Sequence, residues 1–181
     1  MNNKHIQNIV LAALFLAIGL VLPFFTGGEL FGRMLLPLHI PVLLCGLMLG
    51  PKYGFIVGAI LPIVRFLMIG HPPFPIPGLP MTFELAAYGA VIGLLYNRLP
   101  KKPPFLYASL VGAMLVGRVI WGFVMAIMSS IDSNMVFSLG IFWTGAFVNS
   151  ISGIALQIVL IPALILALRA AGWRNEGEYA R

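Results

Sequence analysis

The sequence predicts an all-α integral membrane protein: a single bundle of six transmembrane helices with both termini inside the cell and a ligand pocket in the outer half. Of its 181 residues 60% are apolar and only 9% are charged, whereas a soluble domain carries about 25% charged residues. Several uncharged runs also approach the roughly 20 residues that a helix needs to cross a bilayer. These observations exclude a soluble globular fold, and residues 1–181 are expected to form one domain.

The first three helices are expected at residues 7–25, 34–50 and 53–70. Lys4 precedes the first apolar run, but no small-residue cleavage site follows it, so this run is interpreted as a retained helix and not as a signal peptide. Thr26, Gly27 and Gly28 end it. The sequence Gly50-Pro51-Lys52 separates the second helix from the third, because Gly and Pro interrupt helices.

The last three helices are expected at residues 81–98, 106–128 and 139–169. Segment 71–80 holds five prolines and connects the third helix to the fourth. The uncharged run 133–168 would be about 54 Å long as one helix at 1.5 Å per residue, which exceeds the roughly 30 Å hydrocarbon core. The last helix is therefore expected to start later, to extend beyond the bilayer, or to break near Pro162.

The positive charges predict the orientation. Alternating the connections places most cations on one side: Lys4, Lys52, Arg98, Lys101, Lys102, Arg169, Arg174 and Arg181. Cytoplasmic loops carry the excess of Lys and Arg, so this side is expected to face the cytoplasm. The net charge of +6 is then a property of topology and does not indicate nucleic-acid binding.

Polar residues within the spans predict a binding site, because an ionisable group at membrane depth costs at least about 2.5–3.5 kcal/mol and usually lines a cavity or pairs with another group. Arg118 and Trp121 are three residues apart, and Glu84 and Tyr88 are four apart, so each pair shares a helix face. The candidates converge on the outer half: Arg33, His39, Arg65, Glu84, Tyr88, Arg118, Trp121 and Asn149.

The charges of this set favour an anionic ligand. Arg33, Arg65 and Arg118 outnumber Glu84, the one acid within a span on that side, and a guanidinium binds a carboxylate through two parallel hydrogen bonds. The alternative is that Glu84 pairs with Arg65 or Arg118 only to make their burial tolerable. A single cysteine, Cys45, and three histidines without ligand spacing predict no metal site.

Small residues four apart indicate close helix packing. Gly46 and Gly50, and likewise Gly54 and Gly58 or Gly89 and Gly93, are expected to pack within the bundle.

Three stretches carry a resemblance to a known family: LAALFLAIGLVLPF (11–24), LLPLHIPVLLCGLMLGPKYGFIVGAILP (35–62) and FELAAYGAVIGLLY (83–96). The chain resembles the substrate-binding S components of energy-coupling factor (ECF) transporters, six-helix vitamin-binding proteins of prokaryotic plasma membranes. The resemblance implies that Ala13 and Ala17 face a membrane coupling subunit. It also implies that two ATP-binding cassette ATPases hydrolyse the ATP, so that this chain needs no cofactor of its own.

The ligand and two other classes of function stay open at this point. The excess of arginine favours an acid resembling pantothenate or folate over a neutral or cationic vitamin. A standalone secondary carrier for small solutes and a subunit of a larger membrane complex are the alternatives. A membrane enzyme is not expected, since no cluster of His, Asp and Ser is visible.

Overall fold

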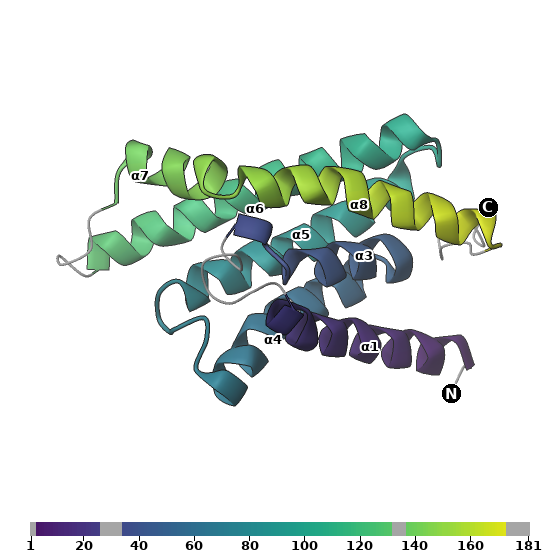
Figure 1. Ribbon diagram of the computed structural model, residues 1–181, viewed down its shortest axis with the longest axis horizontal. Coiled ribbons are helices and arrows are strands. Elements are labelled where there is room, and N and C mark those ends of the chain that lie inside the picture. Colours follow the sequence, from purple (N-terminus) through teal and green to yellow (C-terminus); the bar gives the residue numbers. More distant parts are fainter. Residues whose placement is uncertain (1–2, 26–33, 132–136, 173–181) are drawn as a thin grey trace.

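The computed structural model describes residues 3–25, 34–131 and 137–172, and within these ranges it is helical (Figure 1). The elements are α1 (Asn3–Phe25), α3 (His39–Leu49), α4 (Pro51–Ile69), α5 (Gly78–Arg98), α6 (Pro103–Ile131), α7 (Leu139–Trp143), the π-helical turn η1 (Thr144–Val148) and α8 (Ile151–Ala170). Five of the described helices, α1, α4, α5, α6 and α8, are long and apolar enough to cross a membrane. The chain is therefore a multi-pass membrane protein.

Helix α3 differs from these five in length. Its 11 residues span about 16 Å at 1.5 Å per residue, about half of the hydrocarbon core. Nine of them are buried, because α1, α4, α5 and α8 all pack against this helix. A sixth crossing by residues 34–50 stays a prediction.

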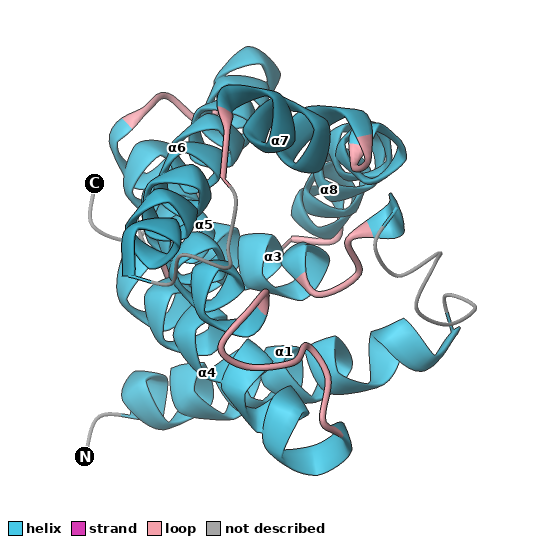
Figure 2. Cartoon of the chain, turned by 90° about the vertical axis from the view of Figure 1, so that its left-hand side faces the viewer, coloured by secondary structure: helices cyan, strands magenta, loops and turns pink. Residues whose placement is uncertain are grey.

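The helices run along one axis, and α1 begins at the same end of the bundle at which α8 ends (Figure 1). We call this the terminal end, and the opposite end the cavity end. Seen from the cavity end, α3 lies centrally, with α1 and α4 on one side and α6 and α8 on the other (Figure 2).

Two apolar clusters form the core. One lies among α3, α5, α6 and α8 and includes Leu43, Tyr88, Met114 and Ile161. The other lies among α1, α3, α4 and α5 and includes Phe15, Val42, Val57 and Leu85.

Glycines bring the backbones of α3, α4 and α5 into contact. A Cβ atom added to Gly89 would lie 2.1 Å from the carbonyl oxygen of Gly54, and one added to Gly46 would lie 2.4 Å from that of Gly89. A Cβ on Gly58 would lie 2.2 Å from the carbonyl oxygen of Leu85. The prediction that these glycines pack within the bundle is confirmed.

The second helix begins later than predicted. Residues 34–35 are helical, but the chain turns at 36–38 and α3 starts only at His39. Leu36 has a φ of 51°, in the left-handed region, and it precedes Pro37, which disfavours the α conformation of the residue before it. The predicted helix 34–50 is therefore wrong in its first turn. Gly50, with a φ of 86°, ends α3.

The last helix is not continuous over 139–169. It is divided into α7, η1 and α8, with the break at Asn149 and Ser150. A break near Pro162, one of the three alternatives expected for this run, does not occur. That residue lies inside α8, where neighbouring helices make proline tolerable in a membrane helix. The other four helices begin a few residues earlier than predicted. For α4 and α6 the reason is that proline is favoured as the first helical residue, as at Pro51 and Pro103.

Candidate functional site

A cavity of about 720 Å³ opens among the helices at the cavity end. Its polar lining consists of His39, Arg65, His71, Glu84, Arg118, Asn149 and Ser150. Its prolines are Pro23, Pro37, Pro72, Pro73 and Pro77, and its remaining lining is Phe24, Leu36, Leu38, Ile69, Met81, Trp121 and Gly145. The cavity has the size and the mostly apolar lining of small-molecule sites.

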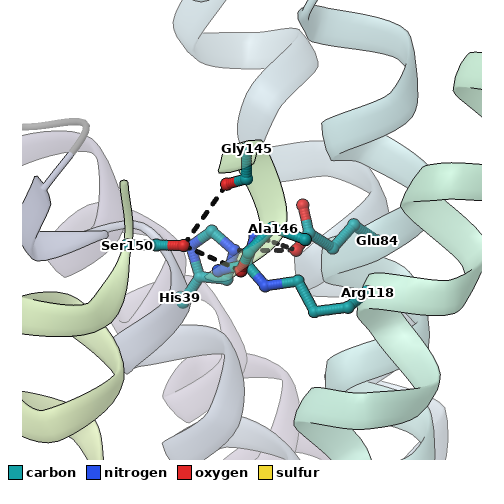
Figure 3. Close-up of polar contacts among 6 residues, drawn as sticks. All are labelled: His39, Glu84, Arg118, Gly145, Ala146 and Ser150. Atoms are coloured by element: carbon teal, nitrogen blue, oxygen red, sulfur yellow. Dashed lines mark hydrogen bonds and ion pairs between the residues drawn. The ribbon is translucent and has the colours of Figure 1, made fainter. Parts of the chain in front are cut away.

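Arg118 and Glu84 form an ion pair in this cavity. Arg118 Nη1 of α6 lies 3.0 Å from Glu84 Oε1 of α5, and His39 Nε2 of α3 lies 3.6 Å from the same oxygen (Figure 3). The three residues are only 1–5% exposed. Three helices thus bring their ionisable side chains to one point.

The ion pair leaves much of the hydrogen-bonding capacity of these groups unused. Among the described residues, Arg118 Nε and Nη2 have no hydrogen-bond partner, and neither ring nitrogen of His39 has one. A buried donor without a partner costs about 1–3 kcal/mol, and more when it is charged. The arrangement therefore suits a ligand that accepts hydrogen bonds from Arg118.

Tyr88 packs against His39 on the side that faces the apolar core. Its ring meets that of His39 edge to face, with centroids 5.1 Å apart, and it is 1% exposed. A Cβ on Gly117 would lie 2.8 Å from the Tyr88 ring, so α6 approaches closely here. Tyr88 does not line the cavity.

Arg65 lines the cavity from α4 and is half-buried. Its Nη1 donates to the carbonyl oxygen of Leu20 over 3.1 Å, and its Cζ lies 5.5 Å from the centroid of the Phe24 ring. Both partners are on α1. With Arg118 and Glu84, Arg65 gives the cavity lining one more positive than negative side chain when the histidines are neutral.

Residues at the break in the last helix, Gly145, Asn149 and Ser150, line another side of the cavity. Ser150 Oγ donates to Ala146 O over 2.9 Å and lies 3.4 Å from Gly145 O, so it satisfies carbonyl groups that the break exposes (Figure 3). Gly145 lies beside the Trp121 indole, which is 3.1 Å from where its Cβ would be. Trp121 also stacks with Phe142 at a centroid distance of 6.2 Å. Aromatic contacts thus hold α7 and η1 against α6.

The structure brings most of the predicted site residues together. His39, Arg65, Glu84, Arg118, Trp121 and Asn149 line the cavity, Tyr88 lies behind His39, and Arg33 lies outside the described residues. The pairing of Glu84 with Arg118 was anticipated as one alternative. Their roles in binding stay predictions.

Sequence reasoning missed Ser150 and His71 as lining residues. The proximity of Ser150 to Asn149 in a helix too long for the membrane was the available signal. Within the described ranges no group of three or more His, Cys, Asp or Glu residues is arranged to hold a metal ion.

A family model described as ECF transporter, substrate-specific component, matches residues 7–165. The match includes all of α3–α7 and most of α1 and α8. It confirms the resemblance predicted from the sequence. No curated protein and no solved structure matches the chain.

Proposed function

Because the chain belongs to the ECF transporter substrate-specific component family, we propose that it binds a small anionic vitamin, or a related micronutrient resembling pantothenate or folate, from outside the cell. Members of this family are transport subunits and not enzymes. The observation that carries the proposed ligand charge is Arg118, a buried guanidinium with two unpartnered nitrogens in the cavity. A carboxylate would accept hydrogen bonds from both.

The charge balance supports an acid over a neutral or cationic ligand. Glu84 neutralises one arginine of the lining, and the half-buried Arg65 leaves an excess of one positive charge. The prolines, Phe24, Trp121 and the aliphatic side chains enclose the less polar part of the molecule. Such a cavity suits a compact acid with an apolar or ring-containing portion.

The proposed orientation places the cavity end outside the cell. Lys4, Lys52, Arg98 and Arg169 lie near helix ends at the terminal end, and the positive-inside rule assigns that end to the cytoplasm. Six passes with both termini inside follow from this orientation, the short α3 completing the second pass together with residues 34–38. The membrane is then the plasma membrane of a prokaryote.

The proposed partners are a membrane coupling subunit and two ATP-binding cassette ATPases, which hydrolyse the ATP. Ala13 and Ala17 are exposed on α1, on the side opposite the buried Phe15 and Gly19. Small side chains permit close approach of a second helix, so this face suits repeated docking and release of the coupling subunit. Bound ligand would be delivered inward on docking.

Two measurements on the detergent-purified protein test this proposal. Isothermal titration with pantothenate and folate is expected to show one tight site per chain, and affinity purification from its own host is expected to recover ATPase subunits. Tight binding without ATPase subunits would favour a standalone carrier or a subunit of another complex. If neither pantothenate nor folate binds, the proposed ligand class is overturned.

A further inference from the structure

His39, Glu84 and Arg118 of the cavity lie on the same helix faces as residues of the apolar cluster among α3, α5, α6 and α8. On α5, Tyr88 belongs to the cluster and Glu84 comes four residues before it. On α6, Met114 belongs to the cluster and Arg118 comes four residues after it. Residues four apart lie on one helix face, about 6 Å apart along the axis. Each polar residue is thus one turn nearer the cavity end.

Helices α3 and α8 repeat this arrangement. Leu43 of α3 belongs to the cluster, and His39 lies one turn nearer the cavity end. Ile161 of α8 also belongs to the cluster, and the residue one turn nearer the cavity end is Gln157. Each of the four helices thus carries one polar residue one turn nearer the cavity end than the apolar cluster. We call these four residues, His39, Glu84, Arg118 and Gln157, the polar layer.

Gln157 has no assigned role, although it is 1% exposed and lies in a stretch of α8, residues 153–168, that is otherwise apolar. Its Nε2 has no hydrogen-bond partner among the described residues. An unsatisfied amide is costly in a membrane interior. A residue kept only for packing would be better apolar, so the amide points to a ligand.

The polar layer has more unpartnered donors than acceptors. Arg118 Nε, Arg118 Nη2 and Gln157 Nε2 are donors, whereas Glu84 Oε1 is the unpartnered carboxylate oxygen and already faces Arg118. His39 contributes one donor and one acceptor in its neutral form. A group that only accepts hydrogen bonds, such as a carboxylate, balances this set.

We propose that Gln157 is a further ligand-binding residue, whose amide N–H donates to the same carboxylate that Arg118 binds; this rests on the proposed function. Gln157 lies behind the present cavity surface, since it is not part of the lining. Binding would therefore require rotation about its side-chain bonds to turn the amide toward the bound group. The carboxylate of the ligand then accepts hydrogen bonds from both the Gln157 amide and the Arg118 guanidinium, which favours acids over other ligands.

The Gln157→Met variant tests this inference. Methionine keeps the length of the side chain and removes the amide, both its carbonyl oxygen and its NH2 group. Thermal unfolding of the ligand-free protein is expected at the wild-type temperature or above it, because an unsatisfied amide is removed. Titration with pantothenate, folate, biotin and nicotinate is expected to show at least about tenfold weaker binding of whichever acid the wild type binds, corresponding to one lost hydrogen bond to a charged group.

Ser109→Ala is the matched control. Ser109 is buried on α6, and its Oγ donates to Phe105 O of its own helix over 2.8 Å. This variant removes a buried polar group away from the layer, and acid affinity is expected to be unchanged.

Three results would overturn the inference. Equal affinity of wild type and Gln157→Met for the bound acid would show that Gln157 does not bind the ligand, while leaving the proposed function intact. A lower unfolding temperature with unchanged affinity would show that the amide has a structural role instead. If the wild type bound none of the four acids, the proposed ligand class would fail and this inference with it.

Discussion

Two variants, one single and one double, separate the contribution of Arg118 to stability from its contribution to ligand binding. The single change Arg118→Met leaves Glu84 as an uncompensated buried charge. Breaking a buried ion pair in this way costs about 3–5 kcal/mol, so the single variant is expected to unfold at a markedly lower temperature. Loss of binding by this variant alone would not identify Arg118 as a ligand contact.

The double variant Glu84→Gln/Arg118→Met removes both charges and keeps the side-chain volumes similar. Exchanging a buried ion pair for apolar residues of similar volume is often neutral or stabilising, and glutamine at position 84 leaves no buried charge unpaired. The unfolding temperature of the double variant is therefore expected near that of the wild type. Its affinity is the informative quantity.

The expected loss of affinity follows from the unpartnered nitrogens of Arg118. Nε and Nη2 are each free to donate to a ligand carboxylate, and a hydrogen bond to a charged group contributes about 1.5–3 kcal/mol. Two such bonds give roughly 3–6 kcal/mol, or a dissociation constant about 10²–10⁴ times higher. Titration calorimetry with the bound acid measures this change.

Glu84→Gln alone is the matched control. It leaves Arg118 as an uncompensated buried charge and is therefore also expected to unfold at a lower temperature. It keeps both donors of Arg118 and removes the anion that competes with a ligand carboxylate, so the acid affinity of the folded protein is expected to be unchanged or higher. The reasoning is refuted if the double variant folds like the wild type and binds the acid within about threefold of it, a difference below 1 kcal/mol.

Three further predictions concern the packing, the coupling face and the second arginine. Gly89→Ala is expected to lower the unfolding temperature, because its Cβ would lie 2.1 Å from Gly54 O; Gly140→Ala, whose nearest atom is 3.8 Å away, is the control, and equal temperatures would contradict this packing. Ala13→Leu is expected to leave acid affinity unchanged but to abolish uptake and recovery of ATPase subunits, and undiminished uptake in cells would exclude this coupling face. Arg65→Met is expected to weaken acid binding less than loss of Arg118 does, because Arg65 already donates to α1; titration showing a larger loss would reverse their order.

The sequence was informative wherever hydropathy and charge act locally. Four of the five long helices, α1, α4, α5 and α6, were predicted to within a few residues at their starts, because long apolar runs and Gly or Pro turns mark them directly. The fifth, α8, begins at Ile151 and not at the predicted residue 139. The convergence of Glu84 and Arg118 was also predictable, since both lie in the outer half of their predicted spans. Counting residues from the end of a helix gives the depth of a side chain along it.

The rest depended on contacts between helices. The break at Asn149 and Ser150 is stabilised by Ser150 bonding to the carbonyl groups of η1 and by aromatic contacts with Trp121, and no local signal predicts such contacts. Pro162 was the stronger local signal, but α8 continues through it. Gln157 was visible as a polar residue in an apolar run, but its significance required knowing which face of α8 meets the core.

The most direct test of the account is mass spectrometry of the small molecules released when the detergent-purified protein is denatured. One carboxylic acid per chain is expected from the wild type and none from Glu84→Gln/Arg118→Met. A neutral or cationic compound at one per chain, or an acid retained equally by the double variant, would contradict the claim that Arg118 binds an anionic ligand in this cavity.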